Sequence, residues 1–218
     1  MDSINADIFI IQECEDPERT PHKAYQEWVG DYLWVGTNKN KGIGIFVKNG
    51  YSIESLDWNP EQLELFLPCR INNHFNLIGV WTKQANSPTF EYIGQFWKYL
   101  QRFKMNMAQN KCLIIGDFNS NSIWNLWDRW WNHSDVVKEL HDIEINSLYH
   151  QQHQEEQGKE SLATLFMHRK IDRPYHIDYM FADKYFLSKV TNLNVGEPKV
   201  WLQHSDHMPL IASFNIHP

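Results

Sequence analysis

The chain has 218 residues, of which 42% are hydrophobic and 14% aromatic, a balance typical of soluble globular proteins. Its length fits one compact domain over residues 1–218, because no Pro/Gly/Ser-rich linker divides it. No apolar run reaches the roughly 18 residues of a membrane-spanning helix. The formal net charge of -7 argues against a general binder of duplex DNA, which needs clustered Lys and Arg. It is compatible with carboxylates that gather a divalent metal.

The cysteines and the N-terminus bear on where the protein works. Cys14, Cys69 and Cys112 are odd in number and lack CxxC spacing, which favours reduced thiols in a cytoplasm. The first seven residues contain no basic stretch followed by an apolar one, so no targeting peptide is predicted there. We therefore expect a cytoplasmic protein.

The first half of the chain reads mainly as strands. Residues 6–12 are nearly all apolar, which predicts a buried strand that ends at Gln12 and Glu13. A loop or short helix is expected over 21–28, and Asn49-Gly50 predicts a hairpin turn. Further strands are predicted over 32–36, 43–48, 51–58, 63–71 and 75–82.

The second half alternates helices with strands. Apolar residues at spacings of three and four predict a helix within 89–109, and 112–115 is a buried strand. A helix is expected over 133–143 with a cap at Ser134, and the polar tract 151–160 reads as an exposed loop. Strands are predicted over 162–167, 176–182, 199–202 and 210–216. The pattern indicates an α/β (α+β) domain with sheets packed between helical layers.

Four polar clusters stand where predicted strands stop. They are Gln12-Glu13, Asp117-Phe118-Asn119, His176-Ile177-Asp178 and Ser205-Asp206-His207. Carboxylates brought to one rim repel each other and lose hydration, and a bound Mg²⁺ or Mn²⁺ with oxygen ligands would relieve both effects. Each cluster alone also fits a solvated strand end or a structural histidine. Their occurrence together favours a metal-assisted site.

The ordered set IIQE, GDFNS, HIDYMF and SDHMPL resembles the signature of the endonuclease/exonuclease/phosphatase superfamily, which includes DNase I, exonuclease III and inositol polyphosphate phosphatases. The resemblance covers residues 7–214. It implies a four-layer α/β/β/α sandwich, DNase I-like, with the active site at one end. It also implies a Mg²⁺-dependent (or Mn²⁺-dependent) phosphoric ester hydrolase.

The resemblance also implies roles for individual residues. Glu13 and Asp206 would be similar to the family's metal ligands, and Asp117 and Asn119 to the pair that positions the attacking water and the phosphate. His207 resembles the histidine that contacts the scissile phosphate, with Asp178 orienting it. Chemistry supports the scheme, because phosphate ester hydrolysis needs an in-line water, a base and positive charge on the non-bridging oxygens.

The chain departs from the family pattern at its N-terminus. Relatives carry a first strand, ending in Asn or Asp, about 30 residues before the QE strand, whereas only twelve residues precede Glu13 here. We therefore expect the first strand to be lacking. Three hypotheses account for this: a shortened chain, a misassigned start codon, or a segment from another chain, which would make a homo-oligomer. Without that ligand, a non-catalytic binding module is an alternative to an enzyme.

Other sequence features leave alternatives open. Trp81 and Lys83 lie where relatives place a phosphate contact, although Lys83 also fits an exposed surface lysine. Four tryptophans of residues 124–131 fit either a base-stacking cleft or helix residues packed on the sheet. His133, His168 and Arg169 are weaker candidates for contacts to phosphate. A nuclease is favoured for the compact length, and a small-molecule or phosphoinositide phosphatase is the alternative.

Overall fold

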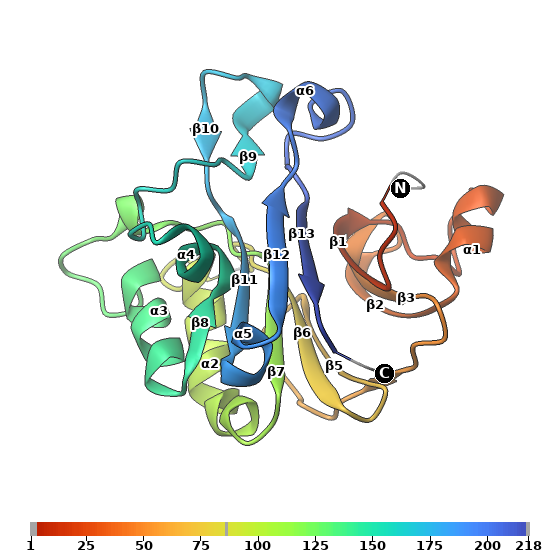
Figure 1. Ribbon diagram of the computed structural model, residues 1–218, viewed down its shortest axis with the longest axis horizontal. Helices are drawn as coiled ribbons and strands as arrows, with labels where there is room; N and C mark the ends of the chain where they lie inside the picture. Colours follow the sequence, from red (N-terminus) through yellow and green to blue (C-terminus); the bar gives the residue numbers. More distant parts are fainter. Residues whose placement is uncertain (1–3, 86, 217–218) are drawn as a thin grey trace.

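A central six-stranded sheet organises residues 4–85 and 87–216, the part of the chain that the computed structural model describes (Figure 1). Strands β6 and β7 are parallel and joined through a helix, whereas the other neighbours are antiparallel. In spatial order its strands are β4 (Ile53–Ser55), β5 (Phe66–Ile71), β6 (Phe75–Trp81), β7 (Cys112–Asp117), β11 (Asp178–Asp183) and β8 (Ile145–Ser147).

Two helices cover one face of this sheet. Helix α2 (Ile93–Ala108) turns Phe96, Tyr99 and Leu100 inward at the predicted spacing, and all three are fully buried. Each such side chain stabilises the fold by about 2 kcal/mol through removal of apolar surface from water. Helix α3 (His133–Asp142) packs beside α2. The predicted helices 89–109 and 133–143 are thus confirmed, with shorter bounds.

A second layer of strands covers the opposite face. It contains a three-stranded sheet in the order β1 (Ile8–Cys14), β3 (Lys41–Val47), β2 (Asp31–Asn38), and a pair of β12 (Val190–Val195) with β13 (Leu210–Phe214). Apolar side chains of both layers share one core cluster. Within the described residues, β1 and β13 are each paired on one side only. The lack of a first strand stays a prediction.

Short helices complete the fold. Helix α1 (Lys23–Val29) forms the outer layer of the four-layer sandwich on this side. The ring centroid of its Trp28 lies 5.2 Å from that of Phe9 and 5.4 Å from that of Phe46. None of the helices within 4–85 and 87–216 has the length and apolar character to cross a membrane. The remaining elements are η1 (Ser122–Trp124), α4 (Leu148–His153), β9 (Leu165–Phe166), η2 (Met167–Arg169), β10 (Pro174–Tyr175), α5 (Lys184–Leu187) and α6 (Pro198–Trp201).

Two strand predictions were wrong, and three strands, β8, β10 and β12, were missed. Asn49 and Gly50 do turn the chain, with φ of 54° and 82°, but β3 and β4 lie in different sheets, so the turn is no hairpin. Residues 199–202 fall in α6, because Pro198 at the first helical position starts a helix there. Strand β12 escaped prediction because its polar residues face outward.

Two loop predictions also need correction. The cap of α3 lies at Asn132, whose N–H donates to Asp135 at 2.8 Å, and not at Ser134. The polar tract 151–160 begins inside α4, and Glu160 turns its side chain into the protein. A polar sequence was read as exposed there, although buried partners satisfy its carboxylate.

Candidate active site

Strand β7 delivers two polar side chains to one end of the six-stranded sheet. Phe118 points into the core against Phe96 and Phe181, and Asp117 and Asn119 on either side of it face away from that core. Gly116 has φ of 153°, and a Cβ there would lie 1.8 Å from the carbonyl oxygen of Val80. A glycine is therefore required where β6 and β7 approach each other beside the site.

Asp117 and Asn119 form a closed hydrogen-bonded unit. The backbone N–H of Asn119 donates to Asp117 Oδ1 at 2.8 Å, and Asn119 Nδ2 donates to Asp117 Oδ2 at 2.7 Å and to the carbonyl of Thr82 at 3.1 Å. Asn119 has φ of 45°, a conformation that Asn tolerates better than most residues. Asp117 is 4% exposed. Burial, and then the charge of Asp178, raise the pKa of Asp117, while His207 and Asn119 oppose the shift.

Strand β11 brings Asp178 opposite Asp117, and His207 joins it from the loop before β13. His207 Nδ1 lies 3.0 and 3.2 Å from the two carboxylate oxygens of Asp178. Burial lowers the pKa of His207, but the hydrogen bond to Asp178 and the charges of Asp178, Asp117 and Asp206 outweigh it and raise the pKa to about 9. His207 is thus an imidazolium at neutral pH.

The hydroxyl of Thr164 fixes the backbone at the start of β11, next to Asp178. Thr164 Oγ1 accepts hydrogen bonds from the N–H groups of Ile177 and Asp178 at 2.9 and 3.0 Å, and the Thr164 side chain is fully buried. Leu165, next along the chain, forms an antiparallel bridge with His207. The sequence offered no signal for Thr164, because its role depends on strands that are distant along the chain.

Asp117, Asp178 and His207 form a candidate metal site. Their ligand atoms all lie within 4.8 Å of one another, and no other such group occurs in the part of the chain that the structure describes. Two carboxylates and a neutral imidazole suit a divalent cation, and the raised pKa of Asp117 marks a buried carboxylate beside a second one, Asp178, whose effect His207 does not fully offset. By donor chemistry, these residues fit a metal.

The two predicted metal ligands lie apart from that group of three. Asp206 is partly buried and raises the pKa of His207, so its charge is felt at the site. Glu13 sits in a bulge between Gln12 and Cys14 with φ of 58°, and its carboxylate accepts from Lys41 Nζ at 2.6 Å. Both side chains of that ion pair are more than half exposed. The structure thus pairs Glu13 with Lys41 rather than with Asp117 or Asp178.

The predicted substrate contacts differ in accessibility. Trp81 is 3% exposed and belongs to the core between the strand layers, so its position favours packing over contact with a substrate. Lys83 Nζ lies 4.0 Å from the centroid of the Trp81 ring. The residue between them, Thr82, donates its backbone N–H to the carbonyl of Asp117 at 2.9 Å. Lys83 therefore directly follows a residue that is bonded to Asp117.

A buried polar network that sequence reasoning missed lies behind Asp178. Asn121 Nδ2 donates to the carbonyl of His176 at 2.9 Å and contacts Glu160 and Tyr179 OH, each at 3.1 Å. Burial raises the pKa of Glu160, but hydrogen bonds from His150, the Gly158 N–H and Asn121 outweigh it and lower the pKa to about 2. Asn121 directly follows the GDFNS motif, a signal that could have been used.

The weaker phosphate candidates fall in two places. His133 is buried, its ring centroid 4.9 Å from that of Tyr179 and its Nε2 atom 3.1 Å from Gln157 Oε1, so it belongs to the buried network. His168 and Arg169 are exposed on the β9–β10 hairpin, which stands beyond the end of β11 (Figure 1).

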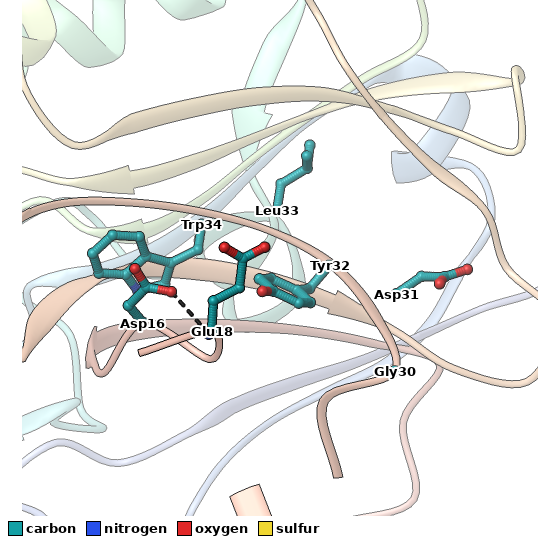
Figure 2. Close-up of a pocket in the computed structure, with 7 residues that line it drawn as sticks. All are labelled: Asp16, Glu18, Gly30, Asp31, Tyr32, Leu33 and Trp34. Carbon is teal, nitrogen blue, oxygen red and sulfur yellow. Dashed lines mark hydrogen bonds between the residues drawn. The ribbon is translucent and has the colours of Figure 1, made fainter. Parts of the chain in front are cut away.

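A surface hollow lies on a different part of the molecule, at the start of β2 (Figure 2). It is lined by Asp16, Glu18, Gly30, Asp31, Tyr32, Leu33 and Trp34, and no predicted site residue is among them. Its carboxylates would repel a phosphate. The residues that line the hollow include no Lys, Arg or His to offset them, whereas the rim of Asp117 and Asp178 carries the imidazolium of His207, so electrostatics favours that rim for phosphate chemistry.

A four-layer sandwich with acids and an imidazole at the end of its central sheet is the DNase I-like fold, which confirms the predicted fold. Among solved structures, an AP endonuclease from Archaeoglobus fulgidus superposes with a TM-score of 0.70 and 18% identity, covering 96% of this chain and 89% of that one. The 3'-5' exonuclease NExo from Neisseria meningitidis superposes with a TM-score of 0.67 and 18% identity, covering 96% of this chain and 90% of that one. AP endonuclease LMAP from Leishmania major superposes with a TM-score of 0.70 and 11% identity, covering 100% of this chain and 80% of that one.

Sequence comparisons add no closer relative. A scan of protein-family models and a search of curated proteins found no match. At 18% identity and below, the structural likeness establishes the fold, and the activity has to be argued from the site.

Proposed function

We propose that this chain hydrolyses phosphodiester bonds of nucleic acid with the help of a divalent cation. The observation that carries the proposal is the convergence of an Asp–Asn unit and an Asp–His ion pair at one end of the central sheet. The fold neighbours that act on DNA include a Neisseria NExo 3' phosphatase, whose structure holds a product DNA hairpin. The site supports phosphate ester hydrolysis, and the DNA-bound neighbour favours nucleic acid over a small molecule as the substrate.

Asp117 is the proposed base, and Asn119 is its positioning partner. A general base works best when its pKa lies near the working pH, and burial with a neighbouring acid raises the pKa of Asp117 in that direction. Asn119 Nδ2 fixes one carboxylate oxygen of Asp117 and is itself held by the Thr82 carbonyl. The unit is suited to hold an attacking water and to take its proton.

His207 is the proposed contact to the scissile phosphate. As an imidazolium it places a positive N–H donor at the rim, where charge on the non-bridging oxygens grows as the phosphate is attacked. Asp178 accepts from Nδ1, which leaves Nε2 for the phosphate. Lys83 is the proposed second cation for the substrate, with Trp81 as the ring on which its amine rests.

The divalent cation is proposed to be held by Asp206 at this rim and by Glu13 near the end of β1. A bound Mg²⁺ or Mn²⁺ would supply positive charge to the phosphate oxygens. Glu13 would first have to release Lys41, an exposed pair of the kind worth about 1 kcal/mol or less. The set of Asp117, Asp178 and His207 is the competing location, and ligand variants separate the two.

The test is a cleavage assay with 5 mM Mg²⁺, Mn²⁺ or EDTA, concentrations on the order of those that saturate such weak oxygen-ligand sites. Substrates are single-stranded DNA, duplex DNA, abasic duplex, RNA, a phosphoinositide and a phosphomonoester. We expect cleavage of nucleic acid that EDTA abolishes and Asp117→Asn reduces. Asp142→Asn, a change in an exposed carboxylate paired with Lys138, is the matched control. Cleavage that survives both EDTA and Asp117→Asn would overturn the proposal.

A further inference from the structure

The segment after the GDFNS motif exposes an unusual number of large apolar side chains. Within residues 122–131, here named the Trp loop, Trp124, Trp127 and Trp130 are 44%, 97% and 64% exposed, and Ile123 and Leu126 are exposed beside them. Only Trp131 is buried, against Phe90 with ring centroids 4.5 Å apart. Single exposed apolar residues are ordinary, but a contiguous group marks a binding surface.

The structure holds the Trp loop in one conformation by hydrogen bonds. Asn132 Oδ1 accepts from the Leu126 N–H at 2.8 Å, and Asn132 Nδ2 donates to the carbonyls of Leu126 and Arg129 at 3.0 and 2.8 Å. Asn125 Nδ2 donates to Ser134 Oγ at 2.6 Å. The tryptophans are thus presented on a fixed support, which lowers the entropy lost when a ligand binds them.

The Trp loop lies next to the proposed active site. It directly follows Asn121, whose side-chain amide donates to the carbonyl of His176, two residues before Asp178. The ring of Trp124 lies 5.3 Å from that of Tyr175 on β10, centroid to centroid. The loop and the β9–β10 hairpin therefore meet beside Asp178.

The hairpin has a local excess of positive charge, in contrast to the net negative charge of the whole chain. Its exposed turn carries Arg169, Lys170 and Arg173 against one carboxylate, Asp172, in a chain of net charge -7. Arg169 donates to the carbonyl of His204 at 3.1 Å, which holds the hairpin to the segment that precedes Asp206. Cations beside exposed aromatic rings are the combination that binds unpaired nucleotides, through phosphates and base faces respectively.

We propose that the Trp loop and the β9–β10 hairpin bind a single-stranded segment of the nucleic-acid substrate, with Trp127 and Trp130 stacking on unpaired bases. This inference rests on the proposed function, and it names the substrate class of the same site. Paired bases offer their faces only at duplex ends, so three exposed indoles are of little use against a continuous duplex. The adjoining cations and phosphate site favour nucleic acid over a membrane or a protein partner.

The first test is binding without cleavage. In EDTA, fluorescence anisotropy compares a labelled oligothymidylate with a blunt hairpin duplex, for the whole chain and its variants. We expect tighter binding of the single strand, and a loss of ten-fold or more in its affinity for Trp127→Ala/Trp130→Ala. The single variant Trp127→Ala, which removes a side chain that contacts almost nothing, should lose part of it. Met105→Ala, an exposed apolar control on α2, should bind like the wild type.

Defined outcomes overturn the inference. Equal affinity for single strand and duplex, or unchanged affinity in both tryptophan variants, would exclude the stacking role. So would sedimentation or vesicle binding showing that the tryptophans drive self-association or membrane binding instead. The cleavage assay separates the two proposals. If the chain cleaves nucleic acid but shows no tryptophan-dependent preference for single strands, this inference alone is refuted. A chain that binds single strands but cleaves no phosphodiester with any metal refutes the proposed function.

Discussion

The two sides of the proposed site differ in how completely the chain assembles them. On the side of the six-stranded sheet, hydrogen bonds fix Asp117 to Asn119 and Asp178 to His207. On the side of β1, Glu13 ends its strand in an exposed ion pair with Lys41. Buried charges must find partners within the fold, whereas an exposed carboxylate can exchange one cation for another at little cost. The first side is therefore fixed by folding, and the second can be fixed by a ligand.

The largest expected effect comes from the fixed side. Asp117→Asn keeps the size of the side chain and removes the base, so the cleavage rate should fall by roughly 10³-fold or more. The free energy of unfolding should not fall, because the change removes a carboxylate that is unfavourably placed. Burial and the charge of Asp178 both raise the pKa of Asp117. Single-turnover cleavage and urea denaturation measure the two quantities. A variant within ten-fold of the wild-type rate would contradict the assignment.

Asp178→Asn tests the ion pair. Without the charge and hydrogen bond of Asp178, the pKa of His207 should fall from about 9, since those are the main influences that raise it. Because the imidazolium is the proposed active form, the rate should decline at a lower pH than in the wild type, with a loss of roughly 10²-fold near pH 8. A pH–rate profile with NMR titration of the His207 ring gives the answer. An unchanged His207 titration would show that Asp178 does not set its charge.

The polar ends of buried strands were predictable, and so was the fixed side of the site. The apolar run that stops at GDFNS puts Asp117 at the end of β7. Asp178 begins β11 instead of ending a strand, and the antiparallel pairing of β11 with β7 sets the two residues opposite each other. Helix α2 followed from its spacing. Such features depend on patterns local to each strand or helix, which sequence carries directly.

Features that depend on distant partners were not predictable. Lys41 binds Glu13 from 28 positions away, and nothing in either segment marks the pair. Glu160 lies in a polar tract and is buried by contacts with Asn121 and His150. The sequence left open whether the tryptophans of 124–130 pack on the sheet or line a cleft, because large aromatics are usually buried, and their exposure depends on how Asn132 holds the loop.

His133, in the buried polar network behind Asp178, predicts a pH dependence of stability. Burial lowers the pKa of His133 to about 4, so the folded protein holds it neutral while the unfolded chain protonates it near 6.5. The unfolded state binds the extra proton between these values, so stability is lost as pH falls through that window, by about 2 kcal/mol between pH 7 and 5. Urea denaturation at both pH values should show this loss, and His133→Gln should lack it.

His168→Gln, a change on the exposed hairpin, is the matched control and should leave the pH dependence as it is in the wild type. If His133→Gln loses stability with falling pH as steeply as the wild type, His133 is not the group that takes up the proton. In that case His176, which is also buried with a lowered pKa, becomes the residue to vary.

The smallest effect is expected on the β1 side, where Glu13 is paired with Lys41. Lys41→Gln removes the amine that holds Glu13, and since both side chains are more than half exposed, the free energy of unfolding should change by about 0.5 kcal/mol or less. If Glu13 binds the cation, the freed carboxylate should lower the Mg²⁺ concentration for half-maximal cleavage by a few fold, and Glu13→Gln should raise it. Lys138→Gln, which breaks the exposed pair with Asp142, is the control and should change neither value. A Mg²⁺ requirement that neither Glu13→Gln nor Lys41→Gln alters would move the cation to Asp117, Asp178 and His207, and the whole site would then lie on the fixed side.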